Sequence, residues 1–243
     1  MNPYYEHAGI TIYHADCREI LPSIKADVII TDPVWPNCPS GKITGHERPY
    51  ELFAEFCELI PPSVRRLVVE LRNDCDPRFL GPVPERLKFL QAMWLQYVMP
   101  GYLGRVLGGN ELAYVFGQPI VVAEGRRVIP SVSPKAQPGD RPNNGHPMSR
   151  ALTHQRFIVN WCSDHGELIC DPFCGSGTTL HAAKGHGRRA VGIEIEERFC
   201  EIAANRLSQE VLDLQPVNRV NYNCGLIHRP RFQRVEETNG AGV

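Results

Sequence analysis

The 243-residue chain lacks most of the marks of membrane, secreted and metal-binding proteins. No apolar run approaches the ~20 residues of a transmembrane helix. The first residues, MNPYYEHAG, lack the basic and apolar regions of a signal peptide. Nine cysteines are scattered without any CxxC pair. This spacing predicts buried thiols in a cytoplasmic protein, with neither a disulfide framework nor a metal site.

The sequence also lacks a dominant charge and the common phosphate-binding motifs. The formal net charge of −1 argues against a general polycationic coat but leaves room for a local basic groove. No GxxxxGK[ST] is present, and the turn Gly175-Ser-Gly177-Thr-Thr-Leu has no third glycine to complete GxGxxG. A phosphate-cradling loop is therefore not supported.

What is present is an alternation of strands and helices. Strand patterns occur at residues 9–13, 26–31, 66–71, 166–172 and 189–195. Helix patterns occur at residues 17–24, 50–60, 149–161, 178–187 and 197–211. We expect Ser149 to cap the third of these helices. This alternation predicts an α/β domain with a Rossmann-like, mostly parallel sheet flanked by helices. We expect the domain at residues 1–215, with a variable segment at about 85–147 and a poorly ordered tail at 216–243.

The strongest local signal is LICDPFCGSGTTL, followed by GIEIE. A strand runs into Asp171, a small-residue turn with Gly175 and Gly177 follows, and a helix begins near Thr178. Glu194 ends the next strand, 23 positions after Asp171. Glycines let a ligand approach the backbone, and an acid at this strand end can take two ribose hydroxyls. Tight packing alone would also explain the glycines, but with Glu194 we favour a ribose-bearing ligand without phosphates, and S-adenosylmethionine (AdoMet) fits.

A second strand, ADVIIT, ends in the sequence DPVWP. Its apolar residues do not alternate with polar ones, which is typical of a central, parallel strand. Its end combines a carboxylate, Asp32, with an aromatic ring, Trp35, between two prolines.

Together, DPFCGSGTT, GIEIE and TDPVWP resemble the AdoMet-dependent methyltransferases that modify amino groups of DNA bases. These enzymes carry a D/N/S-P-P-Y/F/W motif, in which this chain has Val34 at the third place. The order of the motifs, with a His-Pro pair at residue 146 before the glycine turn, resembles the circularly permuted β class over about residues 8–210. The resemblance implies that Asp16 contacts the adenine amino group of AdoMet and that Phe173 packs on its ring. A helix cap and ordinary core packing are the alternatives for these two residues.

The same resemblance implies a mechanism. An exocyclic amine of a DNA base is a poor nucleophile, because its lone pair is delocalised into the ring. Asp32 would accept a hydrogen bond from the amine, the Pro33 carbonyl would accept another, and the extruded base would stack on Trp35. The methyl group would pass in line from sulfur to nitrogen without a covalent enzyme intermediate. Because Val34 departs from the motif, a non-catalytic AdoMet- or DNA-binding protein is an alternative.

We expect a site-specific DNA methyltransferase of a bacterial or phage-host cytoplasm. Adenine N6 is favoured over cytosine N4, because in the family aspartate leads the motif more often at adenine. RNA or a protein amide is a further alternative substrate. Double-stranded DNA is the expected partner, no membrane is involved, and a homodimer is considered. A restriction partner, a regulatory mark and protection of a phage genome are all compatible with the sequence.

A basic stretch between residues 126 and 150 is a candidate for contacts to DNA phosphates. A solvated basic loop is the alternative explanation. The candidate residues are Arg126, Arg127, Lys135, Arg141 and Arg150.

Overall fold

The computed structural model describes residues 2–36, 38, 41, 43–98, 102–103, 106–107, 110–119, 130–142 and 145–209. These residues belong to one unit, Met1–Glu210. The predicted tail at 216–243 lies outside the described residues, as do parts of the predicted variable segment.

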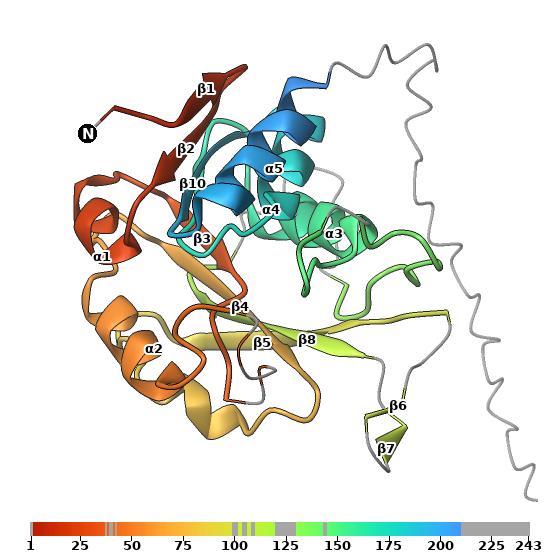
Figure 1. Ribbon diagram of the computed structural model, residues 1–243. Helices are drawn as coiled ribbons and strands as arrows, with labels where there is room; N and C mark the ends of the chain where they lie inside the picture. The colour runs from red at the N-terminus through yellow and green to blue at the C-terminus, as the bar shows by residue number, and fades with distance from the viewer. Residues whose placement is uncertain are drawn as a thin grey trace, which may run out of the picture. The chain divides into compact units, whose positions relative to one another are not determined.

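An eight-stranded sheet forms the centre of the fold, with the strand order β1-β2-β10-β9-β3-β4-β8-β5 (Figure 1). The five strands from β2 to β4 in this order are parallel, whereas β1, β8 and β5 run antiparallel to their neighbours. The strands are β1 (Tyr5–His7), β2 (Ile10–His14), β3 (Val28–Thr31), β4 (Arg66–Arg72), β5 (Phe89–Leu95), β8 (Glu111–Gly117), β9 (Leu168–Asp171) and β10 (Arg189–Glu194). A separate small ribbon pairs β6 (Tyr102–Leu103) with β7 (Val106–Leu107). The sheet confirms the predicted α/β class and its mostly parallel centre.

Helices cover both faces of the sheet (Figure 1). One face packs against α3 (Leu152–Cys162), α4 (Thr178–Gly185) and α5 (Glu197–Ser208), and the other against α1 (Cys17–Ile20), α2 (Pro49–Glu58) and two 3₁₀ turns, Leu21–Ser23 and Pro77–Leu80. Strand β3 shows why the sequence has no alternation: Val28 and Ile30 belong to the first core, and Ile29 belongs to the second. All three side chains are fully buried, so both faces of the strand must be apolar.

The parallel strands place four acids at one edge of the sheet. Strands β2, β10, β9 and β3 are neighbours in that order, and each ends beside an acid: Asp16, Glu194, Asp171 and Asp32 respectively. The carboxyl ends of neighbouring parallel strands meet at a common edge, which is where ligands bind in open α/β sheets. Strand β8 runs the opposite way, so its first residue, Glu111, pairs with the end of β4 and lies at this same edge.

One predicted helix boundary is wrong. Ser149 does not cap α3, which starts at Leu152 after Ala151 and has no side-chain cap. The Ser149 hydroxyl is instead 3.1 Å from the hydroxyl of Ser176, in the glycine turn. The segment before α3 is therefore tied to that turn.

Candidate active site

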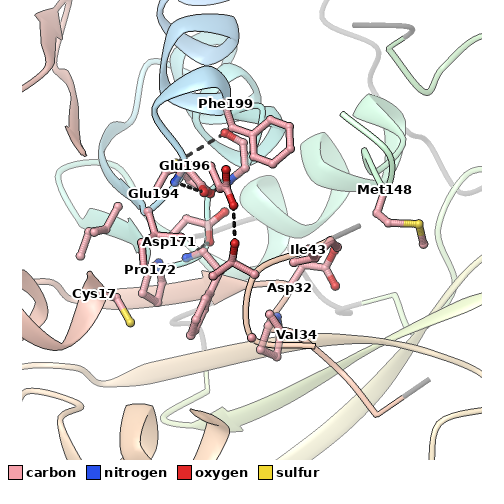
Figure 2. Close-up of a pocket in the computed structure, with 18 of the residues that line it drawn as sticks. Cys17, Asp32, Val34, Ile43, Met148, Asp171, Pro172, Glu194, Glu196 and Phe199 are labelled. Carbon is pink, nitrogen blue, oxygen red and sulfur yellow. Dashed lines mark hydrogen bonds between the residues drawn. The ribbon is translucent and has the colours of Figure 1, made fainter. Parts of the chain in front are cut away.

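One pocket at the carboxyl edge of the sheet gathers both sequence motifs (Figure 2). Asp32 and Val34 lie on one side of it, and Asp171, Pro172 and Glu194 on the other. Among the predicted site residues, those that line the pocket are Asp16, Asp32, Pro33, Trp35, Arg150, Asp171, Phe173, Gly175, Thr178 and Glu194. Segments separated by some 140 positions in sequence are thus brought to a single opening.

The glycine turn is organised by Glu194. One carboxylate oxygen accepts a hydrogen bond from the Gly175 N–H at 2.8 Å, and the other accepts one from the Glu196 N–H at 2.9 Å. Burial raises the pKa of Glu194, while these two backbone donors oppose the shift. Each oxygen has a second lone pair, so the same carboxylate that fixes the turn can also accept hydrogen bonds from a ligand in the pocket.

Asp171 is buried beneath the turn. Its Oδ1 accepts a hydrogen bond from the Phe173 N–H at 3.2 Å. Burial raises its pKa to about 7, although the neighbouring Thr179 and Thr31 side chains and the Phe173 N–H lower it in part. With 3% of its surface exposed, Asp171 contributes mainly by shaping the backbone around the ligand site.

The two glycines of the turn are required by different neighbours. Gly175 has a φ of +50°, and a Cβ atom there would lie 2.9 Å from Nε2 of His146, so the turn passes directly against the His-Pro segment. Gly177 has a φ of +74° and precedes α4, and its Cβ would lie 2.8 Å from the Cβ of Ala203 in α5. Gly177 does not line the pocket. Its predicted role in binding is therefore indirect, through the packing of α4 on α5.

Asp16 caps a helix and also lines the pocket, so its position is compatible with both predicted roles, the helix cap and the contact to AdoMet. Its carboxylate caps α1 by accepting from the Arg18 N–H at 2.9 Å, and it also pairs with the Arg18 guanidinium. That hydrogen bonding holds the pKa of Asp16 below its ordinary value, despite partial burial. Phe173 lines the pocket and also makes an edge-to-face contact with Phe56, at 5.6 Å between ring centroids.

Asp32 is held by a buried arginine that the sequence did not assign to it. Nε of Arg150 donates to Asp32 Oδ2 at 2.6 Å, and Nη2 donates to Oδ1 at 2.5 Å. The Asp32 side chain keeps 19% of its surface exposed, against 6% for Arg150. Burial raises the pKa of Asp32, while the charge and hydrogen bonds of Arg150 oppose that shift. A carboxylate that accepts one hydrogen bond at each oxygen from a guanidinium still has lone pairs available to a ligand in the pocket.

The structure corrects the predicted role of Trp35. Its side chain is 1% exposed and belongs to the core beside α2, so no open face is available for a base. The guanidinium carbon of Arg150 lies 5.0 Å from the centre of its ring, which is a cation–π distance. Trp35 lines the pocket, but almost none of its surface is accessible there.

The predicted set of phosphate-binding residues divides into three parts. Arg126 and Arg127 lie outside the described residues. Lys135 and Arg141 are exposed, although Arg141 also donates to Tyr97 and Glu111. Arg150 does not fit a phosphate contact, because it is buried and both ends of its guanidinium are bound to carboxylates.

Two buried acids lie behind Asp32: Glu111, to which the sequence alone assigned no role, and Glu70, which the sequence did not single out. Glu111, 3% exposed, accepts from Nη1 of Arg150, and Glu70 on β4 accepts from the Gln155 amide at 2.5 Å. Among the described residues, the second oxygen of Glu70 has no hydrogen-bond partner. Burial raises the pKa of Glu70 to about 8, although Arg150 lowers it in part. The available signal was a single acid in each of two apolar patterns: Glu70 lies within RLVVELR, and Glu111 begins ELAYVFG.

The described residues contain neither a metal-binding cluster nor a membrane-spanning helix. Within them, no group of three or more His, Cys, Asp or Glu side chains is arranged to hold a metal ion. No helix in the same residues has the length and apolar character needed to cross a bilayer.

Comparison with known proteins identifies the family. Residues 84–205, half of the chain, match the family model described as DNA methylase (N6_N4_Mtase). The chain belongs to this family of N6/N4 DNA methyltransferases. The match includes the glycine turn, Glu111 and Arg150, whereas Asp32 and Trp35 lie before it.

Relatives and solved structures agree with this assignment. The chain is 36% identical over 86 residues to the type II methyltransferase M.ScaI of Streptomyces caespitosus, covering 35% of this chain and 28% of that protein. It is 40% identical over 65 residues to the type II methyltransferase M2.DpnII of Streptococcus pneumoniae, covering 27% of this chain and 24% of that protein. The matched parts thus span about a quarter of these relatives.

The fold is similar to that of the M1.HpyAVI–SAM complex, with a TM-score of 0.62 and 23% identity over 82% of this chain and all of the other. The cytosine-N4-specific PvuII DNA methyltransferase gives a TM-score of 0.62 and 17% identity over 86% and 89% of the two chains. These likenesses bear out the predicted α/β methyltransferase fold.

Proposed function

We propose that the protein transfers the methyl group of AdoMet to the N6 amino group of adenine in double-stranded DNA. The observation that carries this proposal is the shared pocket: Asp32, from the DPVWP motif, opens onto the same cavity as the glycine turn and Glu194. Family membership supports the reaction class, and the relatives named above are type II methyltransferases.

AdoMet would occupy the side of the pocket made by β9, β10 and the glycine turn. The lone pairs of Glu194 that do not bind the Gly175 and Glu196 N–H groups would accept hydrogen bonds from ribose hydroxyls. Phe173 and Asp16 line the same side and supply an aromatic surface and an acceptor for an adenine ring. A complex of one structural neighbour with SAM supports this choice of cofactor.

The target base would enter beside Asp32. There, the lone pairs not used by Arg150 would accept a hydrogen bond from the exocyclic amine, which favours the pyramidal nitrogen that attacks the methyl carbon. In the transfer, the carbon–sulfur bond breaks as the nitrogen–carbon bond forms, S-adenosylhomocysteine leaves as a neutral thioether, and the proton released from the amine would pass to the Asp32 carboxylate and from there to water. Asp32 must be ionised to act as the acceptor. Its pKa is raised by burial, so we expect the rate to fall on the acid side at a pH above the ordinary range of an aspartate.

Cytosine N4 is the second candidate substrate. It is supported by the similarity in fold to the cytosine-N4-specific PvuII enzyme. The exocyclic amines of the two bases have the same donor chemistry, so Asp32 serves either of them. The leading aspartate of the motif is the reason for preferring adenine.

The experiment is methyl transfer from labelled AdoMet to DNA, followed by digestion to nucleosides and identification of the labelled product. N6-methyladenine supports the proposal, and N4-methylcytosine assigns the second candidate. Parallel reactions with RNA and protein test the other predicted substrates. AdoMet binding without transfer to any of them would contradict a catalytic role.

Other predictions remain to be tested. They are the boundary of the methyltransferase domain at residue 215, the target-recognition role of residues 85–147, a homodimer, a cytoplasmic location and a partnership with a restriction enzyme. The exposed Lys135 and Arg141 remain candidates for phosphate contacts.

A further inference from the structure

A buried chain of charges runs from the pocket into the protein behind Asp32. Arg150 connects two acids: Nε and Nη2 bind Asp32, and Nη1 binds Glu111. Arg150 and Glu111 are 6% and 3% exposed. Only Asp32 and Arg150 line the pocket, whereas Glu111 does not.

Two further donors hold Glu111, and a histidine lies near it. Glu111 accepts from the Tyr97 hydroxyl at 2.7 Å and from Nη2 of Arg141 at 2.8 Å, and Nδ1 of His154 is 3.8 Å away. Burial acts to raise the pKa of Glu111, but Arg150 and its other partners lower it to about 2. The carboxylate is therefore charged at any working pH, and its position is fixed by β5, β8 and α3.

The geometry of the strands explains why this acid can act on the pocket. Glu111 is the first residue of β8 and pairs with Arg72 at the end of β4, next to β3 and Asp32. Because β8 is antiparallel to β4, its start lies at the catalytic edge of the sheet. Buried charges are costly unless paired, so the guanidinium has few alternatives to its place between the two acids.

We infer that Glu111 is a positioning residue, which holds the Arg150 guanidinium in the orientation that aims the free lone pairs of Asp32 at the target amine. This inference rests on the proposed function. Without Glu111, Nη1 of Arg150 loses its partner, and the guanidinium is free to rotate away from the two hydrogen bonds that orient Asp32. Misplacement of an acceptor by about 1 Å is enough to slow a positioned reaction.

The variant Glu111→Gln tests the inference in the full-length protein. We expect the single-turnover rate of methyl transfer to DNA to fall by about 10- to 100-fold, the range seen when a hydrogen-bonded support of a functional side chain is removed. The dissociation constant for AdoMet should change less than about twofold, because Glu111 does not line the pocket. An unchanged rate, or an equal loss of AdoMet binding and rate, would overturn the inference.

The pH profile separates positioning from a simple change of charge. If Arg150 moves, Asp32 loses a positive neighbour and two hydrogen bonds, so its pKa rises and the acid limb moves to higher pH. If Arg150 stays, only a negative charge is lost, so the pKa of Asp32 falls and the limb moves to lower pH. The first result supports the inference and the second contradicts it. The charged or titratable groups facing Asp32 are Arg150, Glu111, Glu70, Arg141, Asp171 and Cys38.

Four further variants complete the test. Glu111→Asp keeps the charge but withdraws the carboxylate by one methylene, and should give an intermediate loss of rate. In the Arg150→Met protein, adding Glu111→Gln should lower the single-turnover rate by less than a further factor of about two, because residues that act through one partner do not have additive effects. If the two substitutions multiply their losses of rate, Glu111 does not act through Arg150. The matched control is Glu167→Gln, because Glu167 also pairs with a buried arginine, Arg66, but follows α3 at the start of β9. It should lower stability and leave the rate unchanged.

A wild-type protein that transfers no methyl group would contradict the proposed function. The inference can still be judged then, from a crystal structure of Glu111→Gln. Arg150 displaced from Asp32 supports it, and Arg150 unmoved overturns it.

Discussion

The two sides of the pocket are built in different ways. Most of the cofactor side, from β9 to Glu194, is one continuous strand–turn–helix–strand segment, and its acid Glu194 hydrogen-bonds to its own glycine turn. Asp16, after β2, is the exception. The target side consists of Asp32 and Arg150, with Glu111 behind them; these residues come from three distant parts of the chain and are joined by ion pairs. Local sequence therefore specifies the cofactor side, whereas the target side depends on the assembled sheet.

The two sides also differ in how their acids are stabilised. Glu194 is held by backbone N–H groups, which need no partner charge. Asp32 is held by the Arg150 guanidinium, which is shared with Glu111. Substitutions on the cofactor side should therefore act mainly on AdoMet affinity, and those on the target side mainly on the rate.

The largest expected effect is that of Asp32→Ala. Removing the acceptor should lower the single-turnover rate by about 1,000-fold or more, the scale of a lost electrostatic stabiliser, and leave AdoMet affinity within about twofold. Stopped single-turnover reactions and equilibrium binding measure the two quantities. Asp27→Asn, at the opposite end of β3 where Asp27 pairs with Arg65, is the control and should leave the rate unchanged. Retained turnover in Asp32→Ala would remove Asp32 from the mechanism.

Glu194→Ala should produce the reverse pattern. Losing the ribose acceptor and the bond to the Gly175 N–H should weaken AdoMet binding by about 100-fold, or about 2.7 kcal/mol. At saturating AdoMet the rate should recover to within about tenfold. Isothermal titration with AdoMet gives the affinity, with the exposed Glu197→Gln as control. Unaltered affinity would show that the ribose lies elsewhere.

Gly177→Ala tests the indirect role of the second glycine. The φ of +74° and a Cβ only 2.8 Å from that of Ala203 should destabilise the fold by about 1–3 kcal/mol. The control is Gly185→Ala, at the end of α4, where a Cβ meets no atom within 4 Å. Urea unfolding of the two variants should differ by at least ~1 kcal/mol, and equal stabilities would count against the predicted packing constraint.

The smallest effect on turnover is expected for Glu70→Gln. Burial raises the pKa of Glu70 to about 8, so the side chain is largely neutral at pH 7 and a glutamine resembles it. The rate should change less than about threefold.

The stability of the same variant should respond to pH. Because the folded pKa of Glu70 lies above its ordinary value of 4.5, its stabilising contribution is full below pH 4.5 and is lost as the pH rises through 8. In this window the wild-type free energy of unfolding should fall by up to ~1.4 kcal/mol per pH unit from this group. Glu70→Gln should remove that part of the slope, and identical slopes would place an ionised Glu70 in the folded protein.

The same contrast explains what sequence analysis could predict. DPFCGSGTT and GIEIE define the cofactor side because turn, helix start and acid follow one another along the chain. The buried strand before Asp32 was also predictable. Its apolar residues do not alternate with polar ones, so apolar side chains lie on both faces of the strand and both faces must be buried. The Arg150–Glu111 pair was not, because its partners are 39 positions apart and only the antiparallel β8 brings them together.

Trp35 and Ser149 show the limits of motif-based assignment. An aromatic residue after a catalytic aspartate predicts a surface for stacking, but here Arg150 covers the ring and the core encloses it. A serine before a helical pattern predicts a cap, but here its hydroxyl meets Ser176. In both cases the local sequence is compatible with two environments, and contacts with distant residues decide between them.

The most direct test of the account is the structure of the protein with DNA and a non-reactive AdoMet analogue. We predict that the carbon in the place of the transferred methyl group lies about 3–3.5 Å from the exocyclic nitrogen of a flipped base, and that this nitrogen donates a hydrogen bond to Asp32. A base bound away from Asp32, or an analogue bound away from Glu194, would contradict it.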